Sequence, residues 1–378
     1  MLGIYLHIPF CLSKCSYCDF YSVTPDDTGM DRYLHALLRE IDRLVPEGES
    51  VDSIYFGGGT PTVFGAKRLC SALEGIAGRA HLTPDCEISM EANPSTSLFS
   101  LLKDCRAGGF NRISFGVQSA VEDELEALTR RHTVDTAAKA IELARQAGFS
   151  NLSADLMLGI PKQTAHSAAY SARFLSSLGI THLSAYLLKL EPGTPMYAMQ
   201  NRLSLPGEDE LCEIYQSVCE TMAQEGFPQY EISNFARPGY SCRHNLKYWK
   251  LEPYLGIGPA AHSFFQGKRF FYPRSVEDFI SHAETGTDGI VLEEESGGGA
   301  EEFLMLRLRL SEGLNLPDFC TRYSSLSLTP LKQRAQQLVQ AGLAQFTHEG
   351  NLSLTTKGFL VSNSVIGFLL DVLEPLPQ

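Results

Sequence analysis

The stretch CLSKCSYCDF, residues 11–20, places three cysteines at the spacing C-x3-C-x2-C directly after a strand-like segment. Three thiolates so close together indicate a metal site, but a structural zinc site needs four protein ligands and a catalytic one needs three plus water. A cubane iron–sulfur cluster held by three thiolates leaves one iron open for an exogenous ligand. Cys11, Cys15 and Cys18 are therefore the candidate metal ligands, and the sequence offers no second C-x2-C pair to complete a closed shell.

Composition limits the class of protein to which this loop belongs. The chain has 44% apolar and 20% charged residues, which is typical of a folded protein. Its length of 378 residues predicts one large domain and a smaller one. A net charge of −13 argues against a nucleic-acid partner. We find no apolar run long enough to span a membrane and no secretory leader, so we expect a cytoplasmic protein in which the ten cysteines form no disulfides.

Outward from the cysteines, strand-like and helix-like segments alternate up to about residue 190. Six strands joined by helices predict a parallel sheet with right-handed crossovers. The predicted strands are 4–8, 51–56, 87–91, 112–117, 152–158 and 182–188, and the predicted helices are 30–45, 65–78, 97–107, 121–147 and 165–178.

The strands alternate in polarity, as strands covered on both faces do not. In RISFGVQS, for example, Ile113, Phe115 and Val117 share one face and the polar positions share the other. We expect the apolar face of each strand to pack on outer helices and the polar face to point inward. This arrangement predicts an incomplete barrel with a ligand in its lumen. The predicted fold class is α/β, with a partial (β/α)6 barrel over residues 1–190; a flat doubly wound sheet is the alternative.

Two further regions follow the barrel. Residues 191–295 contain a helix near 209–225 and an aromatic, glycine-rich stretch, and we expect them to extend the barrel. Residues 296–378 predict helices near 302–310 and 328–341 and a hairpin turning at 349–351, which together resemble a winged helix at the end of a smaller α+β domain. Basic residues there are diluted by acids, so we expect a structural or covering role.

Polar residues recur where successive barrel strands end, which is where barrel active sites lie. GGGTPT (57–62) follows the second strand, Glu91 and Gln118 end the third and fourth, and Asp155 lies on the fifth. Glycines allow close approach of the backbone to a ligand, although the same loop also suits a tight turn. Together these residues predict one polar wall above the cysteines.

With C-x3-C-x2-C closing the first strand, the chain resembles the radical S-adenosylmethionine (SAM) superfamily, in which the amino and carboxylate groups of SAM chelate the open iron of a 4Fe-4S cluster. YLHIPFC, GGGTPT, SMEANP, SFGVQS, LTRRHT and DLMLGIPKQT narrow the resemblance to the oxygen-independent coproporphyrinogen III oxidase group, over about residues 3–370. The resemblance implies SAM contacts for Tyr5, Gly58, Gly59, Thr60, Glu91, Gln118, Arg130 and Asp155; Arg131 competes with Arg130 for its place.

Two departures favour one branch of this group. The oxidases carry a further cysteine two residues after the third, where this chain has Phe20, and they begin with an N-terminal extension, whereas Tyr5 here already lies in the first strand. Both departures match the HemW-type heme chaperones. HNLKYW (244–249) also resembles the H-N-x-x-Y-W segment that this branch associates with heme.

The resemblance implies that His244, Tyr248 and Trp249 contribute to a heme site. An imidazole can ligate heme iron and aromatic rings can face a macrocycle, with Cys242 as an alternative thiolate. The other interpretation is that His244 forms hydrogen bonds within a packed loop.

The resemblance therefore implies a radical SAM heme chaperone that binds a 4Fe-4S cluster, SAM and heme and delivers heme to an acceptor hemoprotein. If SAM is cleaved, a flavodoxin or ferredoxin-like electron donor is implied. The alternative is an enzyme, coproporphyrinogen III dehydrogenase, which converts propionates to vinyl groups. An electron-transfer iron–sulfur module is a third class, and the clustering of only three cysteines argues against it.

Overall fold

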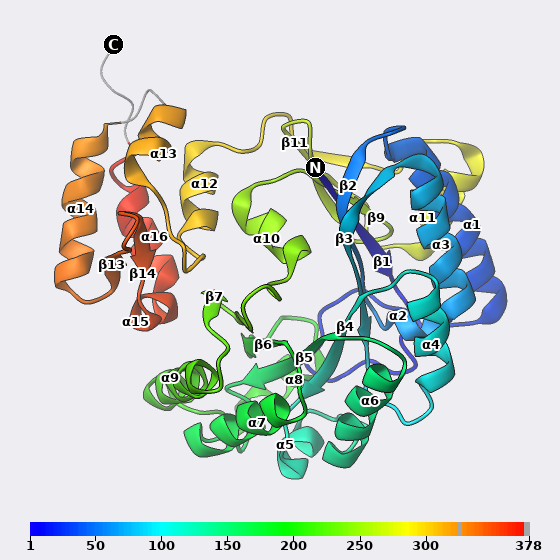
Figure 1. Cartoon of the computed structure of the whole chain (residues 1–378), viewed down its shortest axis with the longest axis horizontal. Helices are drawn as coiled ribbons and strands as arrows, with labels where there is room; N and C mark the ends of the chain where they lie inside the picture. The colour runs from blue at the N-terminus through cyan, green and yellow to red at the C-terminus, as the bar shows by residue number, and fades with distance from the viewer. Residues whose placement is uncertain (324–326, 374–378) are drawn as a thin grey trace.

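A computed structural model describes residues 1–323 and 327–373 and contains one twelve-stranded sheet within that range (Figure 1). Its strand order is β12-β11-β10-β9-β1-β2-β3-β4-β5-β6-β8-β7, and neighbouring strands from β9 through β6 pair in parallel. All six predicted strands are confirmed: β1 (Leu2–Ile8), β2 (Ser50–Gly58), β3 (His81–Ala92), β4 (Arg112–Gln118), β5 (Asn151–Leu158) and β6 (His182–Leu187).

Helices follow the strands of the barrel on its outer side. They are α1 (Asp27–Leu44), α2 (Pro61–Phe64), α3 (Ala66–Arg79), α4 (Phe99–Ala107), α5 (Glu122–Ala127), α6 (Val134–Gln146) and α7 (Ala165–Ser177). The prediction of one helix over 121–147 was wrong. Thr129 has a positive φ of 55°, and the Thr133 hydroxyl accepts from the Thr136 N–H and begins α6, so residues 128–133 form a connection between two helices.

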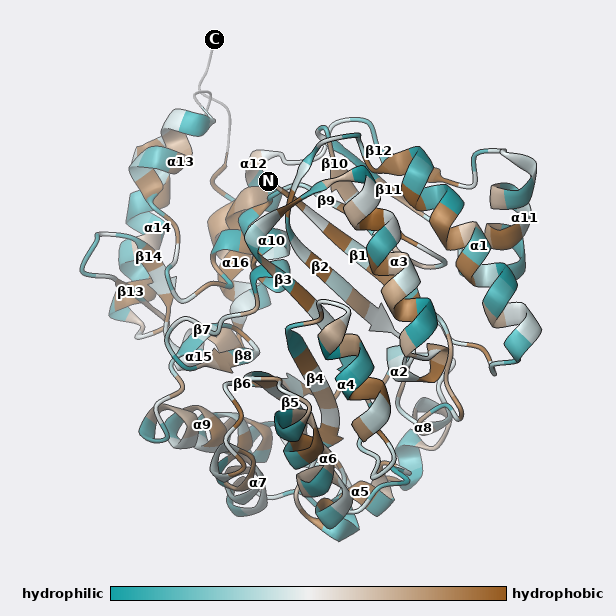
Figure 2. Cartoon of the chain, turned by 45° about the vertical axis from the view of Figure 1, so that its right-hand side comes forward, coloured by the Kyte–Doolittle hydropathy of each residue, from teal (hydrophilic) through white to brown (hydrophobic). Residues whose placement is uncertain are grey.

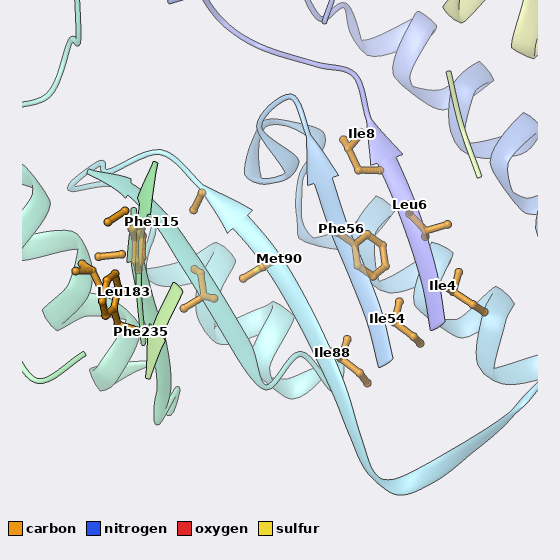
Figure 3. Close-up of a cluster of buried hydrophobic side chains, with 14 of the residues drawn as sticks. Ile4, Leu6, Ile8, Ile54, Phe56, Ile88, Met90, Phe115, Leu183 and Phe235 are labelled. Atoms are coloured by element: carbon orange, nitrogen blue, oxygen red, sulfur yellow. The ribbon is translucent and has the colours of Figure 1, made fainter. Parts of the chain in front are cut away.

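The apolar parity of the strands forms the core, as the alternation predicted. Ile4, Leu6 and Ile8 of β1 are fully buried, and Figure 3 shows them in line with Ile54 and Phe56 of β2. In Figure 2, α1 and α3 alternate between brown and teal, as amphipathic helices that cover a sheet do. The other parity of the strands, which carries the polar side chains, faces the lumen.

Residues 191–295 lengthen the sheet at both edges with short strands that the sequence analysis missed. Next to β6 lie β8 (Asn234–Ala236) and β7 (Gln229–Glu231); next to β1 lie β9 (Tyr254–Ile257), β10 (His262–Phe265), β11 (Lys268–Phe271) and β12 (Val291–Glu294). Strands of three or four residues are too short to show a period of two. The helical segments here are α8 (Pro195–Ala198), η1 (Gln200–Arg202), α9 (Glu208–Gln224), α10 (Arg243–Lys250) and α11 (Val276–Thr285).

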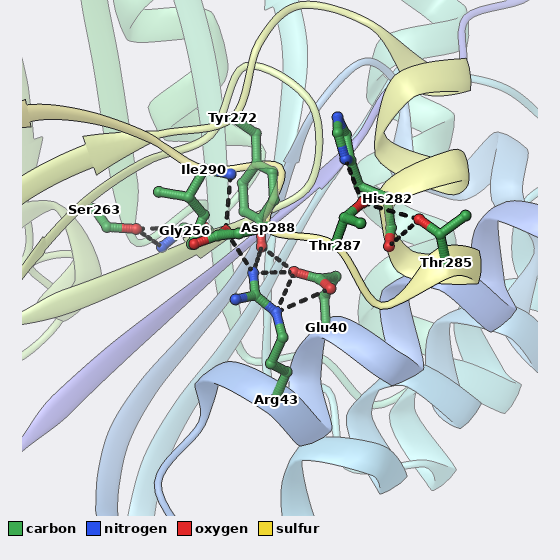
Figure 4. Close-up of polar contacts among 10 residues, drawn as sticks. All are labelled: Glu40, Arg43, Gly256, Ser263, Tyr272, His282, Thr285, Thr287, Asp288 and Ile290. Atoms are coloured by element: carbon green, nitrogen blue, oxygen red, sulfur yellow. Dashed lines mark hydrogen bonds and ion pairs between the residues drawn. The ribbon is translucent and has the colours of Figure 1, made fainter.

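A buried carboxylate fastens the β1-side extension to α1. Glu40 pairs with Arg43 at 2.6 Å and accepts a short hydrogen bond from the hydroxyl of Tyr272, which follows β11 (Figure 4). Arg43 also reaches Asp288, just before β12, at 3.4 Å. The extension is thereby anchored to the helix that follows the cysteine loop.

The C-terminal domain is α+β and ends in a winged-helix-like arrangement. It contains α12 (Ala300–Arg307), α13 (Leu316–Arg322), α14 (Leu328–Gln340), β13 (Ala344–Phe346), β14 (Leu352–Leu354), α15 (Thr356–Leu360) and α16 (Ser362–Leu370). The predicted hairpin is confirmed, with Gly350 at a φ of 83° in its turn. Figure 1 shows this domain beside α10, on the side of the barrel away from α1 and α3. In the described ranges no helix is long and apolar enough to cross a membrane.

Candidate functional site

The three cysteines lie in the loop between β1 and α1. Val23 pairs with both ends of this loop's first turn: its N–H donates to the Pro9 carbonyl at 2.7 Å and its carbonyl accepts from the Cys11 N–H at 3.1 Å. Burial raises the pKa of Cys18, and the nearby Cys15 and Cys11 thiols raise it further. Across residues 1–323 and 327–373, no three His, Cys, Asp or Glu side chains stand close enough together to hold a metal ion. The sulfur-only donor set fits a cluster, and the thiols must turn toward a common centre to hold one.

The glycine-rich loop after β2 holds the cysteine loop in place. A Cβ atom on Gly59 would lie 2.7–2.8 Å from the carbonyl of Ile8 and the backbone N and O of Phe10, so only glycine fits. The Gly59 N–H donates to Ile8 at 2.9 Å and the Thr60 N–H donates to Phe10 at 2.8 Å. These N–H groups therefore bind the neighbouring backbone, and Thr60 Oγ1 lies 3.4 Å from Cys11 Sγ.

Two half-buried carboxylates, those of Glu91 and Asp155, form a carboxylate wall at positions where the sequence predicted polar residues. Glu91 accepts from the Tyr55 hydroxyl at 3.0 Å and from the Gly58 N–H at 3.2 Å, and Asp155 accepts from Ser114 at 3.1 Å. Burial and then Asp155 raise the pKa of Glu91 to about 7, and burial raises that of Asp155. Two acids that repel each other in this half-buried wall suit a ligand that brings a positive charge and hydroxyl groups.

Arg130 reaches the cysteine loop from the connection between α5 and α6. Its Nη1 donates to Cys15 Sγ at 3.2 Å, and its Nη2 donates to Asn93 Oδ1 at 2.7 Å and to the Gly116 carbonyl. Gly116 leaves room for this convergence, because a Cβ there would meet Gln118 Nε2 at 2.9 Å as well as Asn93 and Arg130. Arg131 is exposed. These side chains border a cavity of about 590 Å³ that includes Cys15 and Thr60 in its lining.

Asn93 is a site residue that the sequence analysis did not single out. Its Nδ2 donates to Thr60 Oγ1 at 2.9 Å while its Oδ1 accepts from Arg130. Asn93 therefore joins Thr60, which contacts Cys11, to Arg130, which contacts Cys15. Its place in SMEANP, on the same strand parity as Glu91, was the available signal.

The raised pKa of Glu91 predicts a pH dependence of stability in the ligand-free protein. Because its pKa is about 7 in the folded chain, against an ordinary value of 4.5, the folded state binds the proton more tightly, and the free energy of unfolding falls as pH rises from about 5 to about 7. Glu91→Gln should reduce this loss by about 1–3 kcal/mol. Urea unfolding at pH 5 and pH 8 measures the effect. The exposed Glu126→Gln serves as control, and an unchanged loss in Glu91→Gln would contradict the prediction.

The segment HNLKYW forms α10, and His244 lies buried behind it. Its Nδ1 is 3.1 Å from the Ser53 hydroxyl and its Nε2 is 2.9 Å from the Tyr248 hydroxyl, so both ring nitrogens are engaged. Burial lowers the pKa of His244 to about 3 and raises that of Cys242 to about 12, which leaves a neutral imidazole and a protonated thiol. In this structure His244 is therefore a hydrogen-bonded residue in a packed environment, the second of the two interpretations that the sequence left open.

His244 also connects α10 to the polar wall. Its ring lies 5.5 Å from that of Tyr55 with an interplanar angle of 29°, and Tyr55 in turn stacks with Tyr5 at 6.2 Å. Since the Tyr55 hydroxyl donates to Glu91, a continuous set of contacts joins the HNLKYW helix to the predicted SAM residues.

A cavity of about 600 Å³ lies where α10, the end of β6 and the C-terminal domain meet. Asn245, Tyr248 and Trp249 of α10 line it, whereas His244 does not. Tyr186 of β6 lines it as well, and β6 pairs with β5, the strand that carries Asp155. The cavity therefore adjoins the carboxylate wall.

The family model of the radical SAM superfamily matches residues 5–175, and that of the HemN C-terminal domain matches residues 299–361. Fold and site thus define a radical SAM protein. The solved structure of coproporphyrinogen III oxidase (HemN) from Escherichia coli, a radical SAM enzyme, aligns with a TM-score of 0.81 over 97% of this chain and 89% of that one; at 22% identity it supports the fold alone.

Curated relatives give the narrower assignment. Heme chaperone HemW of Bacillus subtilis is 35% identical over 99% of this chain and 100% of its own length. HemW of Mycobacterium tuberculosis is 34% identical over 97% of this chain and 94% of its own, and that of Escherichia coli is 34% identical over 94% and 96%. The chain belongs to the HemW family of radical SAM proteins.

Proposed function

We propose that the protein binds a 4Fe-4S cluster, SAM and heme and passes heme to an acceptor hemoprotein. Cys11, Cys15 and Cys18 would hold the cluster, whose open iron would accept the amino and carboxylate groups of SAM. The predicted SAM residues would surround it: Glu91 and Asp155 offer carboxylates to its ammonium and hydroxyl groups, and Arg130 offers a guanidinium to its carboxylate. A flavodoxin or ferredoxin-like donor would be required only if SAM is cleaved.

The observation that carries the heme proposal is the lining of the cavity at α10. Three residues of HNLKYW face it, its volume of about 600 Å³ suits a drug-sized or larger flat ligand, and it adjoins the carboxylate wall. We propose that heme enters this cavity against Tyr248 and Trp249. His244 supports Tyr248 from behind through the Nε2 hydrogen bond, and ligation of the iron would require His244 to give up that bond.

Titration with hemin tests the proposal. Trp249 is the chain's single tryptophan, so its fluorescence reports on this wall while the Soret band reports on the heme. Trp249→Phe keeps a ring and should bind heme nearly as the wild type does, whereas Trp249→Ala should weaken binding about tenfold through loss of the aromatic contact. Equal affinity of both variants would contradict this site. In His244→Ala we expect an unshifted Soret maximum; a shifted maximum would identify His244 as the ligand.

The second candidate function, coproporphyrinogen III dehydrogenase, is favoured by the shared fold. Against this function stands Phe20, which occupies the place of the oxidases' further cysteine. Phe20 is 68% exposed, so packing in the core does not account for a phenylalanine at this position. Anaerobic incubation of the cluster-loaded protein with SAM, a reductant and coproporphyrinogen separates the two. We expect no protoporphyrinogen, and clear turnover would overturn the chaperone proposal.

A further inference from the structure

The wall of the α10 cavity carries a guanidinium without an acidic partner. Arg309 follows α12, and its carbonyl accepts from the Ile232 N–H at 3.0 Å, which fixes this part of the chain against the β7–β8 hairpin. Its Nη2 donates to Asn363 at 3.2 Å, and its guanidinium carbon lies 5.7 Å from the centre of the Trp249 ring. In the part of the chain that the structure describes, the buried Nε of Arg309 has no hydrogen-bond partner, and its one side-chain hydrogen bond goes to the neutral amide of Asn363.

The nearby carboxylate of Glu231 does not neutralise this charge. Glu231 is fully buried and accepts from the Ser233 N–H at 2.8 Å and from the side-chain amide of Asn234. Burial raises the pKa of Glu231 to about 7 and lowers that of Arg309; the attraction between the two groups opposes both shifts without cancelling either. A half-buried guanidinium with a free donor is costly unless an anion meets it.

The other basic residue in the lining is already paired. Lys189 lies 81% exposed and contacts Glu191 at 2.6 Å. Arg309 is therefore the residue in this lining whose charge is available to a ligand. Because Arg309 lies over Trp249, a flat ring against the aromatic wall would bring its substituents within reach of the guanidinium fork.

We propose that Arg309 forms a carboxylate-binding subsite of this cavity, which receives an acidic substituent of a flat aromatic ligand. The inference rests on the proposed function, in which that ligand is heme and the substituent is a propionate. Arg309 then fixes the orientation of the macrocycle, with the acidic edge toward the C-terminal domain.

The test pairs an Arg309 variant with a ligand that lacks the acid. Wild type, Arg309→Gln and Arg309→Lys are titrated with hemin and with its dimethyl ester, using Soret absorbance. Arg237→Gln is the matched control, since Arg237 is exposed and likewise lies over an aromatic ring, that of Phe227 at 4.5 Å, away from the cavity. Thermal unfolding of each variant checks the fold.

We expect Arg309→Gln to weaken hemin binding about tenfold or more while leaving affinity for the ester at the wild-type value, with Arg309→Lys in between and Arg237→Gln unchanged. If Arg309→Gln weakens both ligands equally, or neither, the subsite is wrong while heme binding by the wild type still stands. If the wild type binds neither ligand, the proposed function itself fails.

Discussion

Cys15→Ser is expected to abolish assembly of the iron–sulfur cluster and, with it, tight binding of SAM. A serine hydroxyl is a poor ligand for cluster iron, and with two remaining thiolates the loop cannot hold a cubane. Cys15 is also the sulfur that Arg130 contacts at 3.2 Å, so the substitution removes the partner of that guanidinium as well. After anaerobic reconstitution, iron and sulfide content and visible charge-transfer absorbance should fall to background, and SAM affinity should fall at least tenfold.

Cys212→Ser is the matched control, because Cys212 is likewise partly buried and lies on α9, away from the loop. It should load iron as the wild type does. A Cys15→Ser protein that still acquires a full cluster would show that the fold uses a different ligand set, and Cys11, Cys15 and Cys18 would lose their proposed role.

Gly59→Ala is expected to produce the second largest loss. The added methyl group would lie 2.7 Å from the Ile8 carbonyl and 2.8 Å from two backbone atoms of Phe10, so the cysteine loop itself would have to move. Overpacking of this kind costs about 1–3 kcal/mol, and here it separates the loop of Cys11 from Thr60. We expect a lowered free energy of unfolding and a cluster content below half that of the wild type, as a rough estimate from the same cost.

Gly78→Ala provides the comparison within the same chain. Gly78 lies in α3, and a Cβ atom added there would have no neighbouring atom within 4 Å, so alanine should raise helix stability by up to about 1 kcal/mol. Equal cluster content and stability in Gly59→Ala and the wild type would show that the two loops need not be in contact.

The pattern of polar and apolar residues was sufficient to predict the barrel strands, but not the connection that brings Arg130 to the site. The alternation of polar and apolar residues placed all six strands and predicted that Glu91 and Asp155 face inward. This was possible because the face that a strand residue occupies follows from its position along its own strand. The break at 128–133 that delivers Arg130 was missed, although residues 129–133 include no apolar side chain to continue the helical stripe. Its cause is a competing cap at Thr133.

The segment HNLKYW shows a second limit. Nothing near His244 in the sequence reveals that Ser53 and Tyr55, on a strand almost two hundred positions earlier, occupy its surroundings. The cavity at α10 likewise depends on α15 and α16 lying against it, and Arg309 gained its place there from a contact with Ile232. Such sites come from long-range packing, which a single sequence does not encode in any local window.

The pairing of β9 with β1 has a consequence for synthesis. The first strand, which carries the cysteine loop, has β2 on one side and, on the other, a strand made some 250 residues later, with Gly3 donating to the Pro253 carbonyl at 3.1 Å. The buried Lys247 joins the same edge by donating to the Met1 carbonyl and pairing with Asp52. On the ribosome, the nascent chain therefore has a half-paired β1, and an unsupported cysteine loop after it, until most of the protein has emerged. Insertion of the proposed cluster would then come at the end of folding.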